Sequence, residues 1–238
     1  MLSLYSTGNY RQKVKKLKME LNRYIDHTLL KPTTTESDII KLCGEAKSYN
    51  FYSVCVNSSY VPLAKEALKE TNVKICTVVG FPLGAMSTEV KVFEAIKAVE
   101  QGADEIDMVI NIGFLKSNNY VAVLKDISAV KNAIGTTPLK VILEISELSK
   151  NEIVRACEIC IDAKADFVKT STGFSGSGAT LTAVKIMKKS VKDQLRIKAS
   201  GGIRDAETAL KYIEVGVHRI GASSGVAMMN NQTSLSSY

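Results

Sequence analysis

The chain has no tryptophan and only two histidines, His27 and His218, in 238 residues. Two imidazoles cannot supply the three that a catalytic zinc site built from histidines requires, so no metal is expected. The glycine-rich signatures Gly-x-Gly-x-x-Gly and Gly-x-x-x-x-Gly-Lys-Ser/Thr are also missing. Dinucleotide and nucleoside triphosphate binding are therefore disfavoured, and no cofactor is expected.

Aromatic residues and long apolar runs are scarce as well. Aromatics make up 6% of the chain, and they are not interleaved with basic residues as on surfaces that stack nucleic-acid bases. No apolar run approaches the roughly 20 residues that cross a bilayer, and the N-terminus lacks an apolar core followed by a cleavage site. We expect a soluble cytoplasmic protein with no membrane contact.

Positive charge is in moderate excess. The formal net charge is +7, but much of it comes from the basic run 11–18, and the rest is spread over helix faces. We therefore expect no nucleic-acid partner. A modest basic excess suits an anionic small substrate such as a phosphate ester.

Five cysteines are present, which is an odd number. They are scattered over segments with helical and strand patterns, which argues against a disulfide framework and for a reducing compartment. Cys157 and Cys160 form a Cys-x-x-Cys pair in a helical pattern, without a second pair of metal ligands. We interpret them as two small apolar residues on one helix face.

Short Val/Ile-rich runs alternate with helical patterns along the chain. The expected strands lie at 24–30, 52–57, within 74–82 (a strand and the loop after it), at 104–111, 139–145, within 166–173, within 196–202, and at 219–224, where the strand runs into a short helix. The expected helices lie at 35–50, 60–69, 87–101, 120–134, 150–164, 181–190 and 205–215. Near-continuous apolar strands are typical of a parallel sheet covered by helices. The pattern predicts a single-domain (β/α)8 TIM barrel, with an open doubly wound sheet as the alternative.

The segments at the two ends differ from this repeat. Residues 1–22 are expected to form an N-terminal extension with a short basic helix over 12–21, and residues 23–228 the barrel. Residues 229–238 are polar and are expected to be a flexible tail.

One of the expected helices has many apolar positions. In the helix over 87–101, apolar residues fall at Val90, Phe93, Ala95, Ile96, Ala98 and Val99.

Two lysines lie inside consecutive predicted strands, Lys169 and Lys198. Adjacent strands are about 4.8 Å apart, so the two amines should share one site. At about 6 Å and a dielectric constant of about 20, two ammonium groups repel by roughly 3 kcal/mol, which should lower the pKa of one of them. A neutral amine attacks carbonyls to form a Schiff base. This reasoning does not choose between the lysines, and either alone could simply reach solvent from a strand end.

Other polar residues gather at the expected carboxyl ends of the strands. Asp107 lies inside an apolar strand, where it could form a buried ion pair with a lysine and relay protons through a water. Glycine and hydroxyl residues end the last three strands, where barrels of this kind bind phosphate. The candidate phosphate-binding residues are Thr172, Gly173, Gly201, Gly202, Gly221, Ser223 and Ser224.

Six motifs occur together, in order, between residues 22 and 228. They are Asp-His-Thr-Leu-Leu-Lys-Pro at 26–32, Val-Gly-Phe-Pro-Leu-Gly at 79–84, Asp-Glu-Ile-Asp-Met-Val-Ile-Asn at 104–111, Val-Lys-Thr-Ser-Thr-Gly at 168–173, Lys-Ala-Ser-Gly-Gly at 198–202 and Gly-Ala-Ser-Ser at 221–224. This combination closely resembles the deoxyribose-phosphate aldolases, which are class I aldolases.

The resemblance implies reversible cleavage of 2-deoxy-D-ribose 5-phosphate to D-glyceraldehyde 3-phosphate and acetaldehyde. Lys169 matches the Schiff-base lysine of the family, Lys198 the second lysine that lowers the pKa of the first, and Asp107 the acid that transfers protons with a water. Cys55 matches a cysteine near the substrate in some members, although its pattern fits the core. Tyr238 is a candidate for the tail tyrosine that assists proton transfer in some members.

The chain departs from the family pattern in two places. The loop 173–180 differs slightly, and Asp205 stands where a threonine is common after Gly-Gly-Ile-Arg. Asp205 could cap the helix that follows, although an acid near the phosphate site would weaken phosphate binding.

Two rival functions stay open at this point. One is a Schiff-base aldolase of the same fold acting on a different sugar phosphate, and the other is a non-catalytic protein that binds sugar phosphates or nucleic acid. Barrels of this size often form homodimers, but no patch in the sequence specifies the interface.

Overall fold

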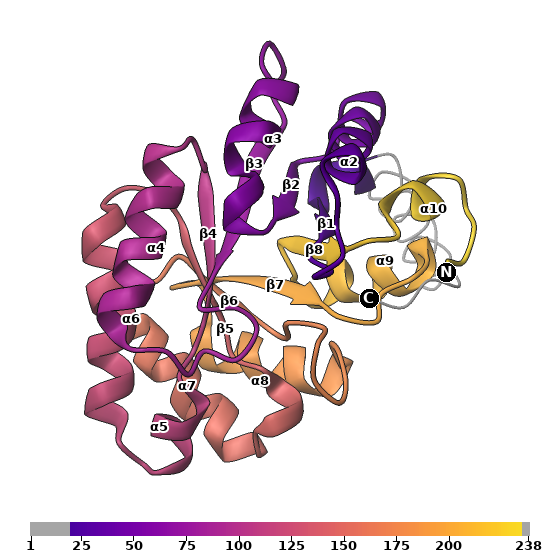
Figure 1. Ribbon diagram of the computed structural model, residues 1–238. Coiled ribbons are helices and arrows are strands. Elements are labelled where there is room, and N and C mark those ends of the chain that lie inside the picture. Colours follow the sequence, from indigo (N-terminus) through magenta and orange to yellow (C-terminus); the bar gives the residue numbers. More distant parts are fainter. Residues whose placement is uncertain (1–19, 235–238) are drawn as a thin grey trace, which may run out of the picture.

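The computed structural model describes residues 20–234, and its centre is a closed barrel of parallel strands in sequence order (Figure 1). The strands are β1 (Ile25–Leu29), β2 (Ser53–Val56), β3 (Lys74–Val79), β4 (Glu105–Val109), β5 (Leu139–Ile142), β6 (Phe167–Lys169), β7 (Arg196–Ser200) and β8 (Arg219–Ala222). The barrel closes where β8 pairs with β1. The (β/α)8 prediction is confirmed, and the open-sheet alternative is wrong.

Helices cover the outside of the barrel (Figure 1). They are α2 (Glu36–Tyr49), α3 (Val61–Ala67), α4 (Thr88–Glu100), α5 (Ile112–Lys116), α6 (Tyr120–Ile134), α7 (Lys150–Asp162), α8 (Leu181–Val191), α9 (Ala206–Val215) and α10 (Gly225–Met229). Short 3-10 turns lie at η1 (Leu21–Tyr24), η2 (Ser58–Tyr60) and η3 (Ile145–Glu147). None of the helices within residues 20–234 is both long and apolar enough to cross a membrane.

Side chains at the helix starts explain several of these boundaries. Thr35 begins α2 and Ser149 begins α7, and each forms a capping box with the acidic residue three positions later. Asp205 caps α9 by accepting a hydrogen bond from the backbone N–H of Thr208 at 2.8 Å. The expected capping role of Asp205 is confirmed.

The strands divide their side chains between two environments. In β7, Ile197 and Ala199 pack in the apolar layer between the strands and the helices, whereas Lys198 and Ser200 have the opposite parity and face the barrel interior. The same alternation turns Asp26 and Asp107 inward. The side of the sheet that faces the helices is therefore apolar, and the barrel interior contains charged residues.

The apolar positions of α4 are not all on its buried face. Val90 and Phe93 on α4 are 52% and 63% exposed, whereas Lys91 is fully buried. Small residues, Ala95 and Ala98, form the inner face of this helix. Lys91 is neutralised there by Asp126 of α6 at 2.6 Å, and it also donates to the carbonyl of Val109 at the end of β4.

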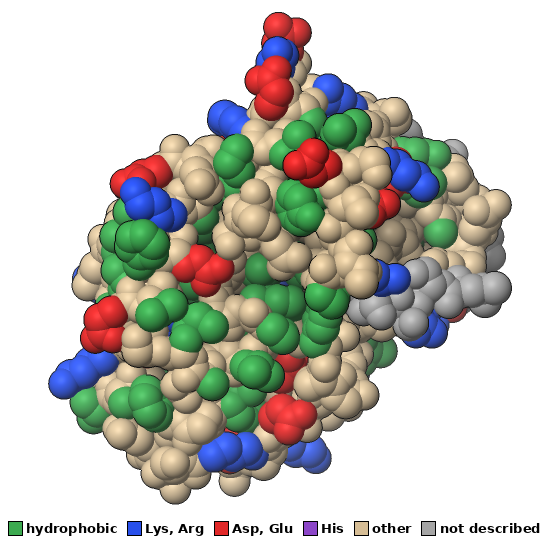
Figure 2. All heavy atoms as spheres, in the orientation of Figure 1, with side chains coloured by type: hydrophobic (Ala, Val, Ile, Leu, Met, Phe, Trp, Pro, Cys, Tyr) green, Lys and Arg blue, Asp and Glu red, His purple; other side chains and the backbone are tan. Residues whose placement is uncertain are grey.

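The surface mixes charges of both signs. Figure 2 shows acidic and basic side chains interspersed over one face of the molecule, with apolar side chains between them. Most of the basic helix expected over 12–21, and the end of the tail with Tyr238, lie outside the described residues. Within the described part of the tail, the N–H of Ser234 donates to the carbonyl of Arg204 at 3.1 Å.

Candidate active site

Three of the residues singled out from the sequence meet inside the barrel. Lys169 ends β6, and Lys198 lies directly opposite it in the middle of β7. Both amines donate to one carboxylate oxygen, Oδ2 of Asp107 on β4, each at 2.8 Å. All three side chains are buried. The expected proximity of the two lysines is present, and the carboxylate is shared between them.

The structure adds charged residues that sequence reasoning did not select. Lys140 on β5 donates to Oδ1 of Asp107 at 2.8 Å and pairs with Glu105 at 2.7 Å. Asp26 on β1 lies 2.5 Å from the amine of Lys198, and Arg219 on β8 pairs with Glu105 at 3.3 Å. Inward parity within apolar strands was the available signal for all of them.

These charges set the proton affinities in the cluster. Burial alone would raise the pKa of Asp107, but Lys140, Lys169 and Lys198 outweigh it and hold that pKa well below 3.8. Burial likewise opposes the charge of Lys198, yet Asp107 and Asp26 raise its pKa well above 10.5. The repulsion between the two lysines is thus outweighed at Lys198 by a second carboxylate, Asp26, which sequence reasoning left out.

The three interior lysines differ in their partners. Lys140 and Lys198 each contact two carboxylates and are fully buried. Lys169 has one carboxylate partner among the described residues, and its side chain is 3% exposed. Lys169 is also the last residue of its strand, at the end of the barrel where this fold places its active sites. The geometry therefore distinguishes the lysines where the sequence pattern did not.

Two cysteines lie beside this cluster. The thiol of Cys76 donates to Oδ1 of Asp107 at 3.1 Å, and Lys140 donates to its sulfur at 3.3 Å. Cys55 is in register with Cys76 on the neighbouring strand. A hydrogen bond from Cys76, opposed by burial, lowers the pKa of Cys55. Cys55 is thus an interior residue close to the charged cluster.

Two sets of possible metal ligands occur in the same interior within residues 20–234. They are Cys55 with Cys76 and Asp107, and Asp26 with Cys76 and Glu105. The carboxylates in both sets are already paired with lysine or arginine. The positive charge of these partners opposes the binding of a cation.

The predicted phosphate-binding residues fall into two groups. Gly201 and Gly202 follow β7 with φ of 90° and 74°, a backbone conformation that favours glycine. A Cβ at Gly202 would meet no atom within 4 Å, so its backbone faces open space. Ser223 and Ser224 follow β8, and Ser224 donates to the carbonyl of Ile203 at 2.8 Å, which ties the two loops together.

Thr172 and Gly221 have other contacts. The N–H and the hydroxyl of Thr172 both donate to the buried carboxylate of Glu144. Gly221 lies within β8, where a Cβ would come within 2.9 Å of Ser200 and 3.0 Å of Cε of Lys198. Thr172 thus braces the loop that contains Gly173, and Gly221 makes room for Lys198.

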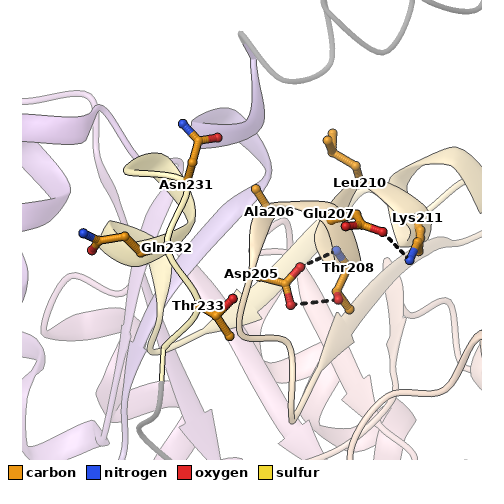
Figure 3. A pocket seen from close by; sticks show the side chains of 9 residues that line it. All are labelled: Asp205, Ala206, Glu207, Thr208, Leu210, Lys211, Asn231, Gln232 and Thr233. Carbon is orange, nitrogen blue, oxygen red and sulfur yellow. Dashed lines mark hydrogen bonds and ion pairs between the residues drawn. The ribbon is translucent and has the colours of Figure 1, made fainter.

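A cavity of about 610 Å³ lies elsewhere, between α9 and the segment after α10 (Figure 3). Asp205 and Thr208 line it, and Glu207 pairs there with Lys211 at 2.8 Å. Of the predicted catalytic and phosphate-binding residues that lie within residues 20–234, none lines this cavity. The carboxylate of Asp205 is engaged by Thr208, as the dashed lines in Figure 3 show.

A closed (β/α)8 barrel with paired interior lysines at one carboxylate is an arrangement suited to Schiff-base chemistry. Residues 21–233 match the family model described as DeoC/LacD family aldolase, and the chain belongs to this family. Proteins named deoxyribose-phosphate aldolase from Streptococcus suis (strain 98HAH33) and Mannheimia succiniciproducens are 56% and 57% identical to it. These alignments cover 89% and 88% of this chain, and 96% and 94% of the relatives.

Solved structures agree with the sequence relatives. The deoxyribose phosphate aldolase from Aeropyrum pernix, described as having a unique tetrameric structure, superimposes with a TM-score of 0.83 at 32% identity. That match covers 92% of this chain and 94% of the other. QR15, described as an aldolase, has a TM-score of 0.86 at 43% identity, and the match covers 89% of this chain and 95% of the other.

Proposed function

We propose that this chain catalyses the reversible cleavage of 2-deoxy-D-ribose 5-phosphate to D-glyceraldehyde 3-phosphate and acetaldehyde, as part of deoxyribose phosphate breakdown. The observation that supports this most directly is Lys169, the interior lysine with one carboxylate partner and a position at the strand end. The names of the relatives at 56% and 57% identity favour this substrate over another sugar phosphate.

Lys169 is the proposed nucleophile. After a proton leaves its ammonium group, the amine attacks the aldehyde carbon of the open-chain sugar. Loss of water from the resulting carbinolamine gives an iminium, which serves as an electron sink. A base removes the proton of the C3 hydroxyl, the C2–C3 bond breaks, and its electron pair forms an enamine. Glyceraldehyde 3-phosphate leaves as the aldehyde.

The remaining steps are proton transfers and hydrolysis. The enamine takes a proton at C2 and becomes the iminium of acetaldehyde, and water then releases acetaldehyde and the free amine. Asp107 contacts both Lys169 and Lys198, so we assign proton transfer to this carboxylate with a water and to Lys198. Tyr238 is proposed as an additional relay from the tail.

The phosphate group of the substrate is assigned to the loops after the last strands. Gly201, Gly202, Ser223 and Ser224 are the main candidates, because backbone N–H groups and hydroxyls in such loops bind phosphate in this fold. Gly173, on the loop after β6, is a further candidate. Thr172 and Gly221 are assigned a supporting role, in line with their contacts to Glu144 and Lys198.

We further propose a cytoplasmic location and a homodimeric assembly. The five cysteines are free and buried, which suits a reducing compartment. Val90 and Phe93 are exposed apolar residues on α4 and are candidates for a subunit contact. Light scattering on the purified protein tests the assembly, and Phe93→Glu should shift a dimer to monomer.

The function is tested by trapping the covalent intermediate. The protein is mixed with acetaldehyde and sodium borohydride, and peptide mapping locates the lysine that gains a reduced ethyl group. We expect the adduct on Lys169, and neither adduct nor turnover in Lys169→Ala. Lys189→Ala, at an exposed lysine on α8, is the matched control and should behave as the wild type. An adduct on Lys198 would reverse the roles of the lysines, and normal turnover in Lys169→Ala would overturn the mechanism.

A further inference from the structure

A second basic site lies at the amino-terminal end of the barrel. A pocket of about 540 Å³ opens where β1, β2, β6, β7 and β8 begin. Its lining combines basic side chains with aromatic rings: Arg23, Arg196, His218, Arg219, Tyr52 and Phe167. The described residues proposed above for catalysis, Lys169, Lys198 and Asp107, lie deeper in the barrel or at its other end, and none of them lines this pocket.

The aromatic rings hold the guanidinium groups in place. The guanidinium carbon of Arg196 lies 4.1 Å from the ring centre of Phe167, and that of Arg219 lies 3.2 Å from the ring centre of Tyr52. When the flat face of a guanidinium group stacks on an aromatic ring, the N–H groups at the edge of the guanidinium remain available. Two of them can donate at once to two oxygens of a phosphate or a carboxylate. Arg219 uses its edge on Glu105, at 3.3 and 3.4 Å.

Arg196 and Arg23 have no such carboxylate partner. Elsewhere on the same rim the cations are neutralised, because Lys74 pairs with Asp104 at 3.5 Å and Lys131 pairs with Asp166 at 2.7 Å. Within residues 20–234, neither Arg196 nor Arg23 forms an ion pair, and the side chain of Arg23 donates only to the carbonyl of Asn50. The arc of the rim between β7 and β1 thus has unneutralised positive charge.

His218 adds a third donor. Its Nδ1 accepts a hydrogen bond from the backbone N–H of Ile197 at 3.2 Å, so the neutral ring has its proton on Nε2. Burial and the positive charges of Lys188, Arg196 and Arg219 lower the pKa of His218, against a weaker opposing effect from Asp193. A histidine in such surroundings gains a proton more easily once an anion is near.

The chain itself offers little negative charge to this pocket. Within residues 20–234, Glu20 is the only acidic residue that lines the pocket. The sequence that precedes it, residues 1–19, has no aspartate or glutamate. One carboxylate cannot neutralise both Arg196 and Arg23, so the pocket keeps positive charge that an anion from solution can neutralise.

We propose that this pocket binds a small phosphate-bearing anion, with Arg196, Arg23 and the Nε2–H of His218 as its donors. The shared chemistry is a phosphoryl group, whether from an inorganic phosphate or from a nucleotide. Arg219 connects the site to the interior, because it pairs with Glu105 and Asp26, and these pair in turn with Lys140 and Lys198.

The two histidines provide a direct test on the full-length protein. Their imidazole NMR signals are followed during titration with inorganic pyrophosphate and, separately, with adenosine monophosphate. We expect the His218 signal to move with saturation and its titration midpoint to rise by about one pH unit. His27 lies beside Ser223, near the proposed substrate-phosphate loops, so an anion bound only there would move the His27 signal instead.

Variants distinguish anion binding in this pocket from a general effect of the net charge of the protein. Arg196→Glu should weaken pyrophosphate binding at His218 by about tenfold or more, and Arg196→Gln should weaken it less. Lys189→Glu makes the same charge change at an exposed lysine outside the pocket and should leave the affinity unchanged. Tighter binding of adenosine monophosphate than of pyrophosphate would identify a nucleotide as the ligand.

Two results would overturn the proposal. One is a His218 signal that stays unchanged in millimolar pyrophosphate and adenosine monophosphate. The other is equal affinity in the wild type and in Arg196→Glu, with the folded state of the variant verified by its remaining NMR spectrum.

Discussion

Asp107 is the residue on which the interior of this protein depends. Three buried lysines contact its two oxygens, and each of these charges would be very costly in an apolar barrel without it. Buried ion pairs seldom add much net stability, but removing one partner leaves an uncompensated charge. Stability therefore does not explain why these charges are buried, whereas a reaction that uses the amines and their protons does.

The dependence of each charge on its partner can be measured by replacing Lys198. Lys198→Met leaves Asp26 buried with one remaining ion pair among the described residues, to Arg219 at 3.7 Å, and a more distant attraction to Lys140. It should lower the free energy of unfolding by roughly 3–5 kcal/mol. Adding Asp26→Asn should restore part of that loss, because the uncompensated charge is removed. Urea denaturation of the two single variants and the double variant gives the coupling energy.

A surface pair is the control for this cycle. Lys211 and Glu207 lie 2.8 Å apart, i and i+4 on α9, and both are exposed. Lys211→Met should leave the free energy of unfolding nearly unchanged, because water and salt screen exposed ion pairs. Strictly additive effects of Lys198→Met and Asp26→Asn would contradict the assigned pairing.

At the scale of elements, β8 leaves room for the lysine of its neighbour. Gly221 has an ordinary strand conformation, so alanine is excluded there only by the contacts of its Cβ with Ser200 and Lys198. Gly221→Ala should displace the Lys198 amine and lower kcat at least about tenfold, with a smaller effect on KM. Steady-state kinetics with 2-deoxyribose 5-phosphate measure both constants.

Gly44→Ala is the matched control for Gly221→Ala. It lies within α2, where an added Cβ would meet no atom within 4 Å. Gly44→Ala should leave kcat unchanged and stabilise the fold by about 0.5–1 kcal/mol, because alanine is the better helix former. If Gly221→Ala retained full kcat, the role of Gly221 as a spacer for Lys198 would be wrong.

The sequence predicted the elements well because their pattern is local. Val/Ile-rich runs and capping residues such as Thr35 and Asp205 depend only on near neighbours. The five-residue helix α5 was missed because it spans little more than one turn. On α4, the positions of the apolar residues alone do not identify the buried face, because alanines and the Lys91–Asp126 pair form the contact with α6.

The site was predicted only in part for the same reason. Lys169, Lys198 and Asp107 could be selected because a charge inside an apolar strand stands out. Lys140 and Asp26 have the same signal, but their roles depend on which strands become neighbours across the barrel, and this is not encoded locally. The preference for Lys169 over Lys198 follows from counting carboxylates around each amine, which needs the three-dimensional structure.

For the whole molecule, the interior cluster predicts how stability depends on pH. The pKa values of Asp107 and Asp26 are lowered in the folded state, so their contribution is present above the ordinary value of 3.8 and is lost as pH falls towards the folded values. The pKa values of Lys140 and Lys198 are raised, so their contribution is present below 10.5 and is lost only as pH rises through the higher folded values. Between these limits the cluster contributes a constant stability.

The free energy of unfolding should therefore be flat near neutral pH, begin to fall below about pH 5, and fall most steeply below 3.8. The loss continues down to the folded pKa values and totals about 1.4 kcal/mol for each pKa unit of carboxylate lowering. The double variant Asp26→Asn, Lys198→Met lacks one of the two carboxylates and should fall less steeply. Urea denaturation at a series of pH values gives both slopes. Equal slopes in the wild type and the double variant would mean that acid destabilisation originates at surface carboxylates, and that the charged interior does not set the lower pH limit of the fold.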